Sequence, residues 1–408
     1  MLQSCLPRSD SMAGQVCDTG QVDNIVGRTA LVCIYADPEN YPPTLNGITV
    51  LSERFEQVFV LGIGSSVTSW QFPSNCTIKK LEGPSGKRGV FHMIRSIHKR
   101  RLFEKAIAYI LAERQPELFL CYDDIAVYAG WNAKHRVAWR GSFWFHNHDA
   151  ADPERVSRRS TLGLSLACQP EIFSELDVFS LPAMERRRFF PMDRLKGEEV
   201  FVPNYPELSF YAKFGSRHHN LNEKTIRLIY QGSISGGHGL EETLPILERS
   251  FAELSITLTL VGPVRDEYRD SLVEEARRHG VEDRVEFLGS VPYRLLPYIT
   301  RAHSIGIAIH MPKDIVYSTG GTASNKIYEY GACGLPVLAF DSSHYRDHLE
   351  KYRWVSFVDG TEESFLIAIQ HIVDNYSDLS NQAVRDFQNR VNFRSGFTRA
   401  LNLALDTN

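Results

Sequence analysis

Short apolar runs alternate with stretches of helical periodicity along most of the chain. In the first half the apolar runs predict strands at residues 30–35, 58–61, 118–122, 142–146 and 178–181. In the second half they predict strands at 226–230, 256–261, 285–288, 305–309, 337–339 and 354–358. Strands that alternate with helices indicate parallel sheets, because a parallel connection needs a crossover. We therefore predict an α/β fold.

The helical stretches lie between these runs. They are predicted at 45–56, 90–113, 125–131, 239–250, 267–279, 295–301, 326–333 and 364–374, with two pieces between 153 and 190 and one or two amphipathic helices in 380–404. The alternation breaks near Pro203 and Pro206, because two prolines around a short polar step stop both helix and strand. Two α/β halves joined by such a linker imply an interdomain cleft, the usual place for a ligand.

The domain boundaries follow from this break. We predict a first domain at 24–205, a second at 206–385 and a C-terminal helix at 386–408 that packs back toward the first domain. Residues 1–23 are rich in Ser, Gly and Asp and are expected to be disordered.

Composition narrows the class of partner. A chain of 408 residues is too long for one core and suits two domains. The net charge of −4 argues against nucleic acid as the main partner. Seven dispersed cysteines fit reduced thiols in a cytosol better than disulfides or a zinc site. No apolar run approaches the roughly 18–20 residues of a membrane span, and we expect a cytoplasmic localisation.

Residues 324–339 are the most informative segment. They predict a helix with one carboxylate, Glu329, a stop at Gly334, and then a short buried strand. A helix N-terminus that points into a cleft suits a phosphate, because its first amides lack intrahelical partners. A glutamate one turn further in can hold the two hydroxyls of a ribose. The alternative is an ordinary αβ unit whose glutamate faces water.

A glycine-rich segment, 232–239, follows the first strand of the second half. Its glycines let backbone amides approach a pyrophosphate closely, and the next helix favours negative charge at its start. A tight turn between strand and helix is the alternative. Together with 324–339, the segment favours a diphosphate-sized anion between the two elements.

The strand at 142–146 ends in polar residues, which in an open α/β sheet point toward the ligand crevice. Alternation along the strand sends His146 and His148 to one side and Asn147 to the other. No further ligand cluster is visible, so contacts with substrate hydroxyls are favoured over a metal, and a structural role stays open. Asp123 and Asp124 are predicted to cap the following helix.

Basic residues gather in two places. The stretch 79–105 carries Lys87, Arg88, Arg95, Lys99, Arg100, Arg101 and Lys105, and a second group is Arg186, Arg187 and Arg188. Such runs are usually solvated faces. Docking on anionic lipid at the inner face of a membrane, or on an anionic acceptor, is the alternative.

These segments together resemble the GT-B glycosyltransferases, most closely glycosyltransferase family 4 (group 1). The resemblance covers most of the chain from about Ala30 onward, and it is most specific in 324–339 and 230–240. Supporting stretches are 260–263, 285–289, 202–206 and the loop 41–47. It implies two Rossmann-like domains with mostly parallel sheets facing an interdomain cleft, a nucleotide-sugar donor and transfer with retention. It implies no metal and no other cofactor.

The resemblance also assigns residues. It implies that Glu329 holds the ribose, that Gly289 to Val291 border the base, and that His146, with His148 as a second candidate, contacts the transferred sugar. The remaining donor contacts are expected from Lys326, Gly232, Ser233, His238, Gly239, Gly321, Thr322, Ala332 and Gly47, with Cys333 and Gly334 beside Ala332.

The chain departs from the family pattern at three places. Gly321 stands where the family has a second glutamate, eight positions before Glu329, and Ser233 and His238 stand where it has an arginine and a lysine. Lys326, Lys313, His238 or backbone amides must then meet the diphosphate. The segment 318–324 is expected to be a loop of small residues whose backbone replaces the missing carboxylate.

The prediction is a retaining glycosyltransferase that moves a sugar from a nucleoside diphosphate sugar, with UDP expected, to a hydroxyl of a glycan, a lipid-linked saccharide or a small molecule. The departures keep two alternatives open. One is a catalytically inactive GT-B protein that binds a nucleotide sugar or acts as a scaffold, and the other is a nucleotide-sugar epimerase.

Overall fold

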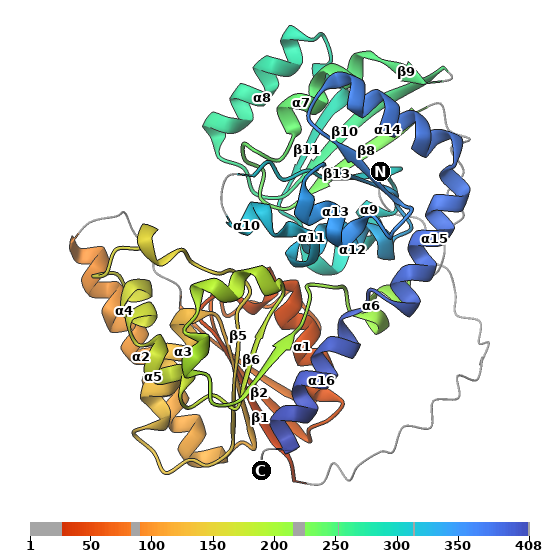
Figure 1. Cartoon of the computed structure of the whole chain (residues 1–408). Helices are drawn as coiled ribbons and strands as arrows, with labels where there is room; N and C mark the ends of the chain where they lie inside the picture. Colours follow the sequence, from red (N-terminus) through yellow and green to blue (C-terminus); the bar gives the residue numbers. More distant parts are fainter. Residues whose placement is uncertain (1–26, 83–89, 215–224, 252, 313–314, 407–408) are drawn as a thin grey trace.

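The computed structural model describes residues 27–82, 90–214, 225–251, 253–312 and 315–406, which form two α/β lobes (Figure 1). The predicted disordered segment 1–23 and the basic residues Lys87, Arg88 and Lys313 lie outside the described residues. Each lobe is built on its own sheet, as the alternating sequence pattern predicts.

The N-terminal lobe contains a seven-stranded parallel sheet in the order β3-β2-β1-β4-β5-β6-β7. Its strands are β1 (Thr29–Ile34), β2 (Gln57–Ile63), β3 (Cys76–Leu81), β4 (Leu118–Tyr122), β5 (Ser142–His146), β6 (Val178–Leu181) and β7 (Glu198–Phe201). The prediction missed β3 and β7, the two edge strands. In β7 only Val200 is fully buried, so neither edge strand carries the continuous apolar run of a central strand.

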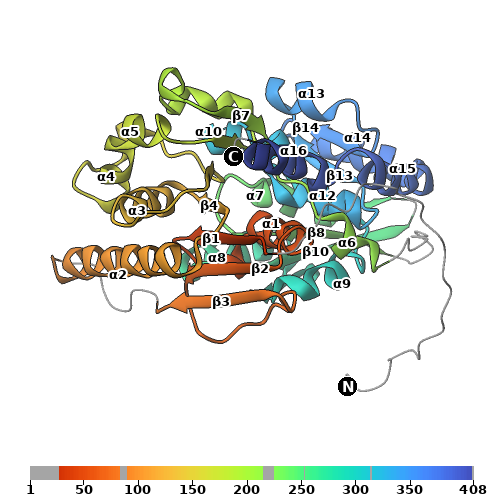
Figure 2. The same cartoon turned by 90° about the horizontal axis from the view of Figure 1, so that it is seen from below.

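Helices cover both faces of this sheet. They are α1 (Pro42–Ser52), α2 (Val90–Arg114), α3 (Asp124–Lys134), α4 (Thr161–Ala167) and α5 (Gln169–Phe173), with 3-10 turns at Pro38–Asn40, Pro153–Arg155, Met184–Phe189 (η3) and Met192–Arg194. One face packs under α2, α3 and α5, and the other under α1 and the C-terminal helix α16 (Phe393–Asp406), as Figure 2 shows from below. Helix α16 buries an apolar stripe in this lobe: Phe393, Phe397, Ala400, Leu401 and Ala404.

The C-terminal lobe has a parallel sheet in the order β11-β10-β8-β12-β13-β14, with the short β9 antiparallel to β10. Its strands are β8 (Thr225–Gln231), β9 (Ser250–Phe251), β10 (Leu254–Val261), β11 (Val285–Gly289), β12 (Ile305–Ala308), β13 (Val337–Phe340) and β14 (Val355–Val358). Its helices are α6 (Leu208–Ala212), α7 (Leu240–Thr243), α8 (Asp266–Arg278), α9 (Leu296–Thr300), α10 (Ile315–Ser318), α11 (Gly320–Ala323), α12 (Asn325–Ala332), α13 (Ser343–Leu349), α14 (Glu362–Asp374) and α15 (Tyr376–Asn389).

Two predicted elements of this lobe were wrong. The helix expected at 239–250 is only the single turn α7 followed by a 3-10 turn, Leu244–Glu248, and Ser250 already belongs to β9. Pro245 removes an amide donor from the middle of that stretch and so limits the helix. The loop expected at 318–324 is instead largely helical, in α10 and α11.

The chain passes between the lobes twice. After β7 it runs through residues 202–207, where the Asn204 side chain donates to the carbonyl of Ala323 at 2.7 Å. It returns through α15 into α16, whose Arg394 binds Glu207 of the first passage and Glu53, the C-cap residue of α1. These two passages fix one side of the molecule and leave a cleft on the other.

Candidate active site

The cleft between the lobes contains a cavity of about 460 Å³ that both lobes line. The N-terminal lobe contributes Asn40, Pro42, Asp149 and Arg186. The C-terminal lobe contributes the strand-end residues 230–233, then His238, Tyr293, Leu296, His310, Tyr317, Gly320, residues 323–326, and Glu329. A neighbouring hollow of about 620 Å³ shares Gln231, Gly232, Ser233 and Tyr293 and continues to Pro263 and Val291.

These residues meet because they follow the carboxyl ends of parallel strands. Ser233 follows β8, His310 follows β12, Asp149 follows β5 and Arg186 follows β6, so each comes after the carboxyl end of a parallel strand. In open α/β sheets these ends form the ligand crevice. Two sheets that face each other with these edges therefore place polar groups on both walls of one cavity.

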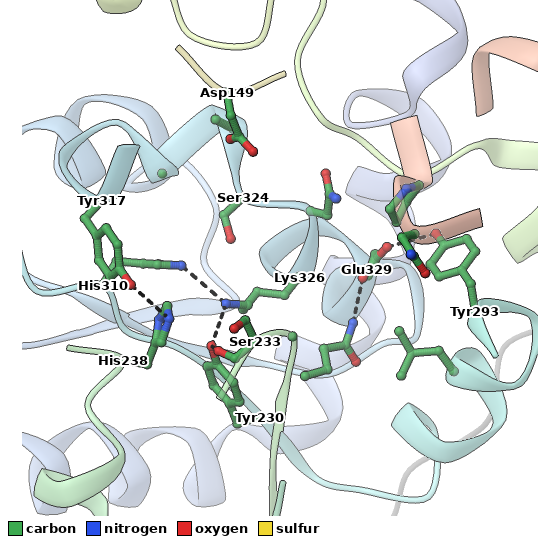
Figure 3. Close-up of a pocket in the computed structure, with 18 of the residues that line it drawn as sticks. Asp149, Tyr230, Ser233, His238, Tyr293, His310, Tyr317, Ser324, Lys326 and Glu329 are labelled. Atoms are coloured by element: carbon green, nitrogen blue, oxygen red, sulfur yellow. Dashed lines mark hydrogen bonds between the residues drawn. The ribbon is translucent and has the colours of Figure 1, made fainter. Parts of the chain in front are cut away.

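Glu329 lies in the second turn of α12 and is only 4% exposed. Its carboxylate accepts hydrogen bonds from Gln231 Nε2 at 2.6 Å and from the Tyr293 hydroxyl at 2.8 Å. Burial raises its pKa, although the bonds from Tyr293 and Gln231 oppose that rise. The side chain borders the cavity and does not face bulk water, which is where a ribose-binding carboxylate would have to lie (Figure 3).

Lys326 lies one turn before Glu329 and is the centre of a second group of side chains. Its ammonium donates to the Tyr230 hydroxyl at 3.2 Å and lies 3.3 Å from His310 Nε2 (Figure 3). Burial lowers its pKa to about 7, against a smaller opposing effect of Glu329. The pKa of His310 is well below its usual range, because of burial and because Lys326 and His238 are close. This end of the cavity can therefore stabilise an incoming anion, which would restore the full charge on Lys326.

The first residues of α12 also border the cavity. Ser324, the N-cap residue, and Asn325 and Lys326, the first two helical residues, all line it. Ser324 makes no side-chain capping bond, so the helix does not satisfy its own first amides in that way. Gly232 approaches from β8 with φ of 129°, and a Cβ there would lie 3.3 Å from Lys326 Cε. The Gly232 backbone, the Lys326 ammonium and the first residues of α12 thus lie close together, and binding of a diphosphate there stays a prediction.

Arg186 is a site residue that the sequence analysis assigned to a solvated basic run. It is 1% exposed, and it donates from Nε to Thr319 Oγ1 at 2.9 Å and from a terminal nitrogen to the His148 carbonyl at 2.6 Å. It therefore reaches across the cleft from η3 to the C-terminal lobe. Its position after the carboxyl end of β6 could have indicated a residue of the ligand crevice. The sequence analysis interpreted it as part of a solvated basic run because two further arginines follow it.

His146 and His148 point to the same side of their strand, as predicted, with ring centroids 5.0 Å apart. Both are almost fully buried, and neither lines the cavity. His146 Nδ1 is 2.8 Å from Ser180 Oγ, whereas His148 stacks on the Tyr122 ring with centroids 4.7 Å apart. The Nε2 atoms of both rings are buried without a hydrogen-bond partner among the described residues. Their contact with a transferred sugar stays a prediction.

The predicted aspartate cap was wrong. Asp123 is the N-cap residue of α3 by position, with φ of 66°, but its side chain makes no capping bond. Its carboxylate instead accepts from the His148 amide at 2.7 Å and meets His148 Nδ1 at 3.1 Å. Asp124 is buried and accepts from Gln169 Nε2 at 2.7 Å. The acidic pair thus orients the segment after β5.

Several predicted donor-binding residues line one of the two hollows: Gly232, Ser233, His238, Lys326 and Glu329 line the cavity, and Val291 lines the neighbouring hollow. Gly289 does not line either hollow and is two residues before Val291. Gly239 is buried, and a Cβ there would meet the Ile309 side chain at 2.6 Å. It shapes the turn before α7 and does not face the cavity.

Gly47, an expected donor contact, lines neither hollow. Residues 42–52 are helix α1, and a Cβ at Gly47 would lie 2.1 Å from the Tyr122 hydroxyl, inside the N-terminal lobe. Asn40 and Pro42, before and at the start of this helix, are the residues of this segment that reach the cavity. The sequence analysis placed residue 47 both in the predicted helix 45–56 and in the loop 41–47 of the family resemblance, and the structure agrees with the helix.

Two further assignments do not agree with the geometry. Gly321 and Thr322 do not line the cavity, and their carbonyls accept from Tyr328 and Asn204. Ala332 is the last residue of α12, and the next amides, of Cys333 and Gly334, bond to carbonyls of the same helix. These groups end a helix and have no free amide to offer a ligand. Gly320, Ala323 and Ser324 line the cavity in place of Gly321 and Thr322.

The basic stretch before residue 105 is partly structural. Arg100 is buried, binds Glu104 at 2.6 Å and lies over the Tyr128 ring. No helix of the described residues is long and apolar enough to cross a bilayer.

Comparison with known families and folds identifies the architecture. Residues 227–375 match the family described as "Glycosyl transferases group 1". The match covers most of the C-terminal lobe, from within β8 to just past the end of α14. A search of curated proteins finds no match. The narrower assignment to glycosyltransferase family 4 stays a prediction.

Solved structures extend the GT-B likeness to both lobes. Sucrose-phosphate synthase from Thermosynechococcus elongatus has a TM-score of 0.66 at 14% identity, covering 93% of this chain and 99% of its own. Trehalose-6-phosphate synthase OtsA has a TM-score of 0.65 at 11% identity, covering 93% and 98%. Anabaena HepE in complex with UDP has a TM-score of 0.61 at 14% identity, covering 93% and 100%. The predicted GT-B fold is therefore confirmed, and the family match supports glycosyl transfer.

Proposed function

We propose that this protein is a retaining glycosyltransferase of the group 1 family that takes a sugar from a UDP-sugar and passes it to a hydroxyl of a glycan, a lipid-linked saccharide or a small molecule. The observation that carries the proposal is the cavity in which Glu329 and Lys326 lie one helical turn apart below the N-terminus of α12. A nucleoside diphosphate needs one group that accepts hydrogen bonds from the ribose hydroxyls and, about one helical turn away, a site for the diphosphate anion. The UDP and UDP-glucose complexes of HepE support the choice of nucleotide.

In this proposal Glu329 binds the ribose hydroxyls, and the base lies toward Val291 and Pro263 in the neighbouring hollow. The diphosphate lies between the Gly232–Ser233 backbone, Lys326 and the first amides of α12. The sugar lies toward the opposite wall, near Asp149 and Arg186. The lining residues of the cavity and of the neighbouring hollow support this arrangement.

Bond breaking releases the diphosphate, so the transition state gains negative charge on its oxygens. Lys326, Arg186 and the first amides of α12 would stabilise that charge, and closure of the lobes around the donor would limit the access of water. The acceptor hydroxyl loses its proton as it attacks, and the leaving phosphate is the base that the family resemblance implies. We propose that no metal takes part in this step.

Two experiments test the proposal. In a thermal-shift panel of UDP, GDP, ADP and dTDP, UDP at about 100 times its dissociation constant should stabilise the protein by about 2.7 kcal/mol, and the other nucleotides by less. With UDP-sugars and candidate acceptors, free UDP should form only when an acceptor is present. NMR of the glycoside should show the anomeric configuration of the donor, and an inverted product would refute retention.

The same assay separates the alternatives. Substitutions at Gly321, Ser233 and His238 relative to the family pattern are the observation that favours an inactive binding protein. Such a protein would bind UDP and release none with any acceptor. Conversion of one UDP-sugar into another without acceptor would instead indicate an epimerase.

A further inference from the structure

A cluster of metal-binding side chains lies outside the cleft, where η3 of the N-terminal lobe meets α13 of the C-terminal lobe. Glu185 Oε1 is 3.3 Å from His344 Nδ1 and 3.0 Å from His348 Nε2. The three donor atoms lie within 4.8 Å of one another, and the two imidazole centroids are 4.4 Å apart. None of the three residues lines the two cleft hollows.

The arrangement has the spacing of a zinc site. His344 and His348 are four residues apart on α13, so their rings project from the same helix face. Tetrahedral Zn²⁺ binds nitrogen and oxygen at roughly 2.0–2.2 Å, which separates neighbouring donors by about 3.3–3.5 Å. Both distances from the Glu185 oxygen are close to this value. We propose that Glu185, His344 and His348 bind Zn²⁺ between the lobes, with water as the fourth ligand.

The surroundings of His344 make room for this role. A Cβ at Gly321 would lie 3.2 Å from the His344 ring, so a larger side chain at 321 would press against the imidazole. Gly321 stands at the position where the family resemblance implies a glutamate, and beside it is His344, whose ring contacts Glu185 of the other lobe. The departure from the family pattern and the new cluster occupy one place in the fold.

Binding here would connect the lobes. Glu185 belongs to the N-terminal lobe and the two histidines to the C-terminal lobe, so the bound ion holds η3 against α13. The next residue, Arg186, lines the cavity and contacts Thr319. The bound ion cross-links η3 and α13 and so holds the two lobes together at this part of the cleft. The inference does not depend on which ligand the cleft binds.

The test is metal binding by the full chain, with any affinity tag removed and prior treatment with EDTA. Titration with ZnCl₂ against a chromophoric chelator should show one saturable site per chain. Glu185→Gln, His344→Ala and His348→Ala should each weaken Zn²⁺ binding at least tenfold, whereas His371→Ala, at an exposed histidine of α14, should bind as the wild type does.

A crystal of the Zn²⁺-treated protein gives the second measurement. Anomalous scattering at the zinc edge should place one ion among the three side chains. Glu185→Gln keeps the size of the side chain, so its loss of binding, with unchanged circular dichroism, would not reflect misfolding. An ion found elsewhere, or equal binding by all four variants, would overturn the proposal and leave Glu185 as an ordinary ion-pair partner of the histidines.

Discussion

At the scale of single residues, Glu329 carries the most specific prediction. Glu329→Gln keeps the shape of the side chain but removes the charge that accepts from Gln231 and Tyr293. A hydrogen bond to a charged group contributes about 1.5–3 kcal/mol, so UDP affinity should fall about 10- to 100-fold. Isothermal titration with UDP measures this change. Glu362→Gln, at an ion pair with Arg249 on the surface of the same lobe, is the matched control, and equal dissociation constants for the two variants would refute the ribose assignment.

For Lys326 we predict that the protein takes up protons when UDP binds. Because the pKa of Lys326 is about 7 in the free protein, its side chain is mostly the neutral amine at pH 8. The charge of UDP should raise this pKa, so binding at pH 8 should take up protons, and affinity should fall as pH rises above 7. Titration calorimetry in buffers of different ionisation enthalpy measures the uptake.

Lys326→Met is the test of that assignment. The variant should bind UDP about 10-fold or more weakly at pH 7 and should take up no protons at pH 8. Persisting proton uptake in the variant would assign the titration to another group.

Lys326 also affects the stability of the fold. Because its pKa in the folded protein is below the ordinary value of 10.5, the unfolded chain holds more protons between pH 7 and 10.5. This group therefore makes the free energy of unfolding rise with pH in that range.

At the scale of elements, the packing of α1 on α16 depends on Gly47. A Cβ there would overlap the Tyr122 hydroxyl and lie 3.0 Å from the Phe397 ring. Gly47→Ala should therefore lower the free energy of unfolding by about 1–3 kcal/mol, despite the better helix propensity of alanine. Urea unfolding followed by circular dichroism measures it. Gly396→Ala in α16, where the nearest atom to the added Cβ is 3.4 Å away, should be neutral or slightly stabilising. Equal midpoints for the two variants would contradict this account.

The same elements show what the sequence could predict. Central strands such as β4 and β5 are mostly apolar and buried at every position, so the pattern alone located them. The edge strands β3 and β7 lack such a pattern because they are mostly half-buried or exposed, and the helices α10 and α11 have only four residues each, too few to show helical periodicity. The site divides in the same way. Glu329 and Lys326 follow from one local helix motif, whereas Arg186 and Tyr293 reach the cavity only through the approach of the two sheets and the loops after them.

At the scale of the whole molecule, Arg186 connects the two lobes beside the cavity that it lines. Its guanidinium bonds Thr319 on the far wall and the His148 carbonyl on the near wall, both in buried surroundings. Arg186→Met preserves much of the apolar stem but leaves that carbonyl without this donor. The lobes should then separate more easily, and the sugar end of the cleft should lose a positive charge.

We therefore expect Arg186→Met to lower the rate of UDP release in the presence of an acceptor at least tenfold, with UDP affinity changed less than threefold. Small-angle X-ray scattering of the free variant should give a larger radius of gyration than the wild type. Arg187→Met is the control, since Arg187 is about half exposed and pairs with Glu199 of its own lobe. A radius of gyration and a rate equal to those of the control would mean that the cleft closes without this contact. The scattering result does not depend on the chemistry, because the arginine crosses the cleft whether or not the ligand is a UDP-sugar.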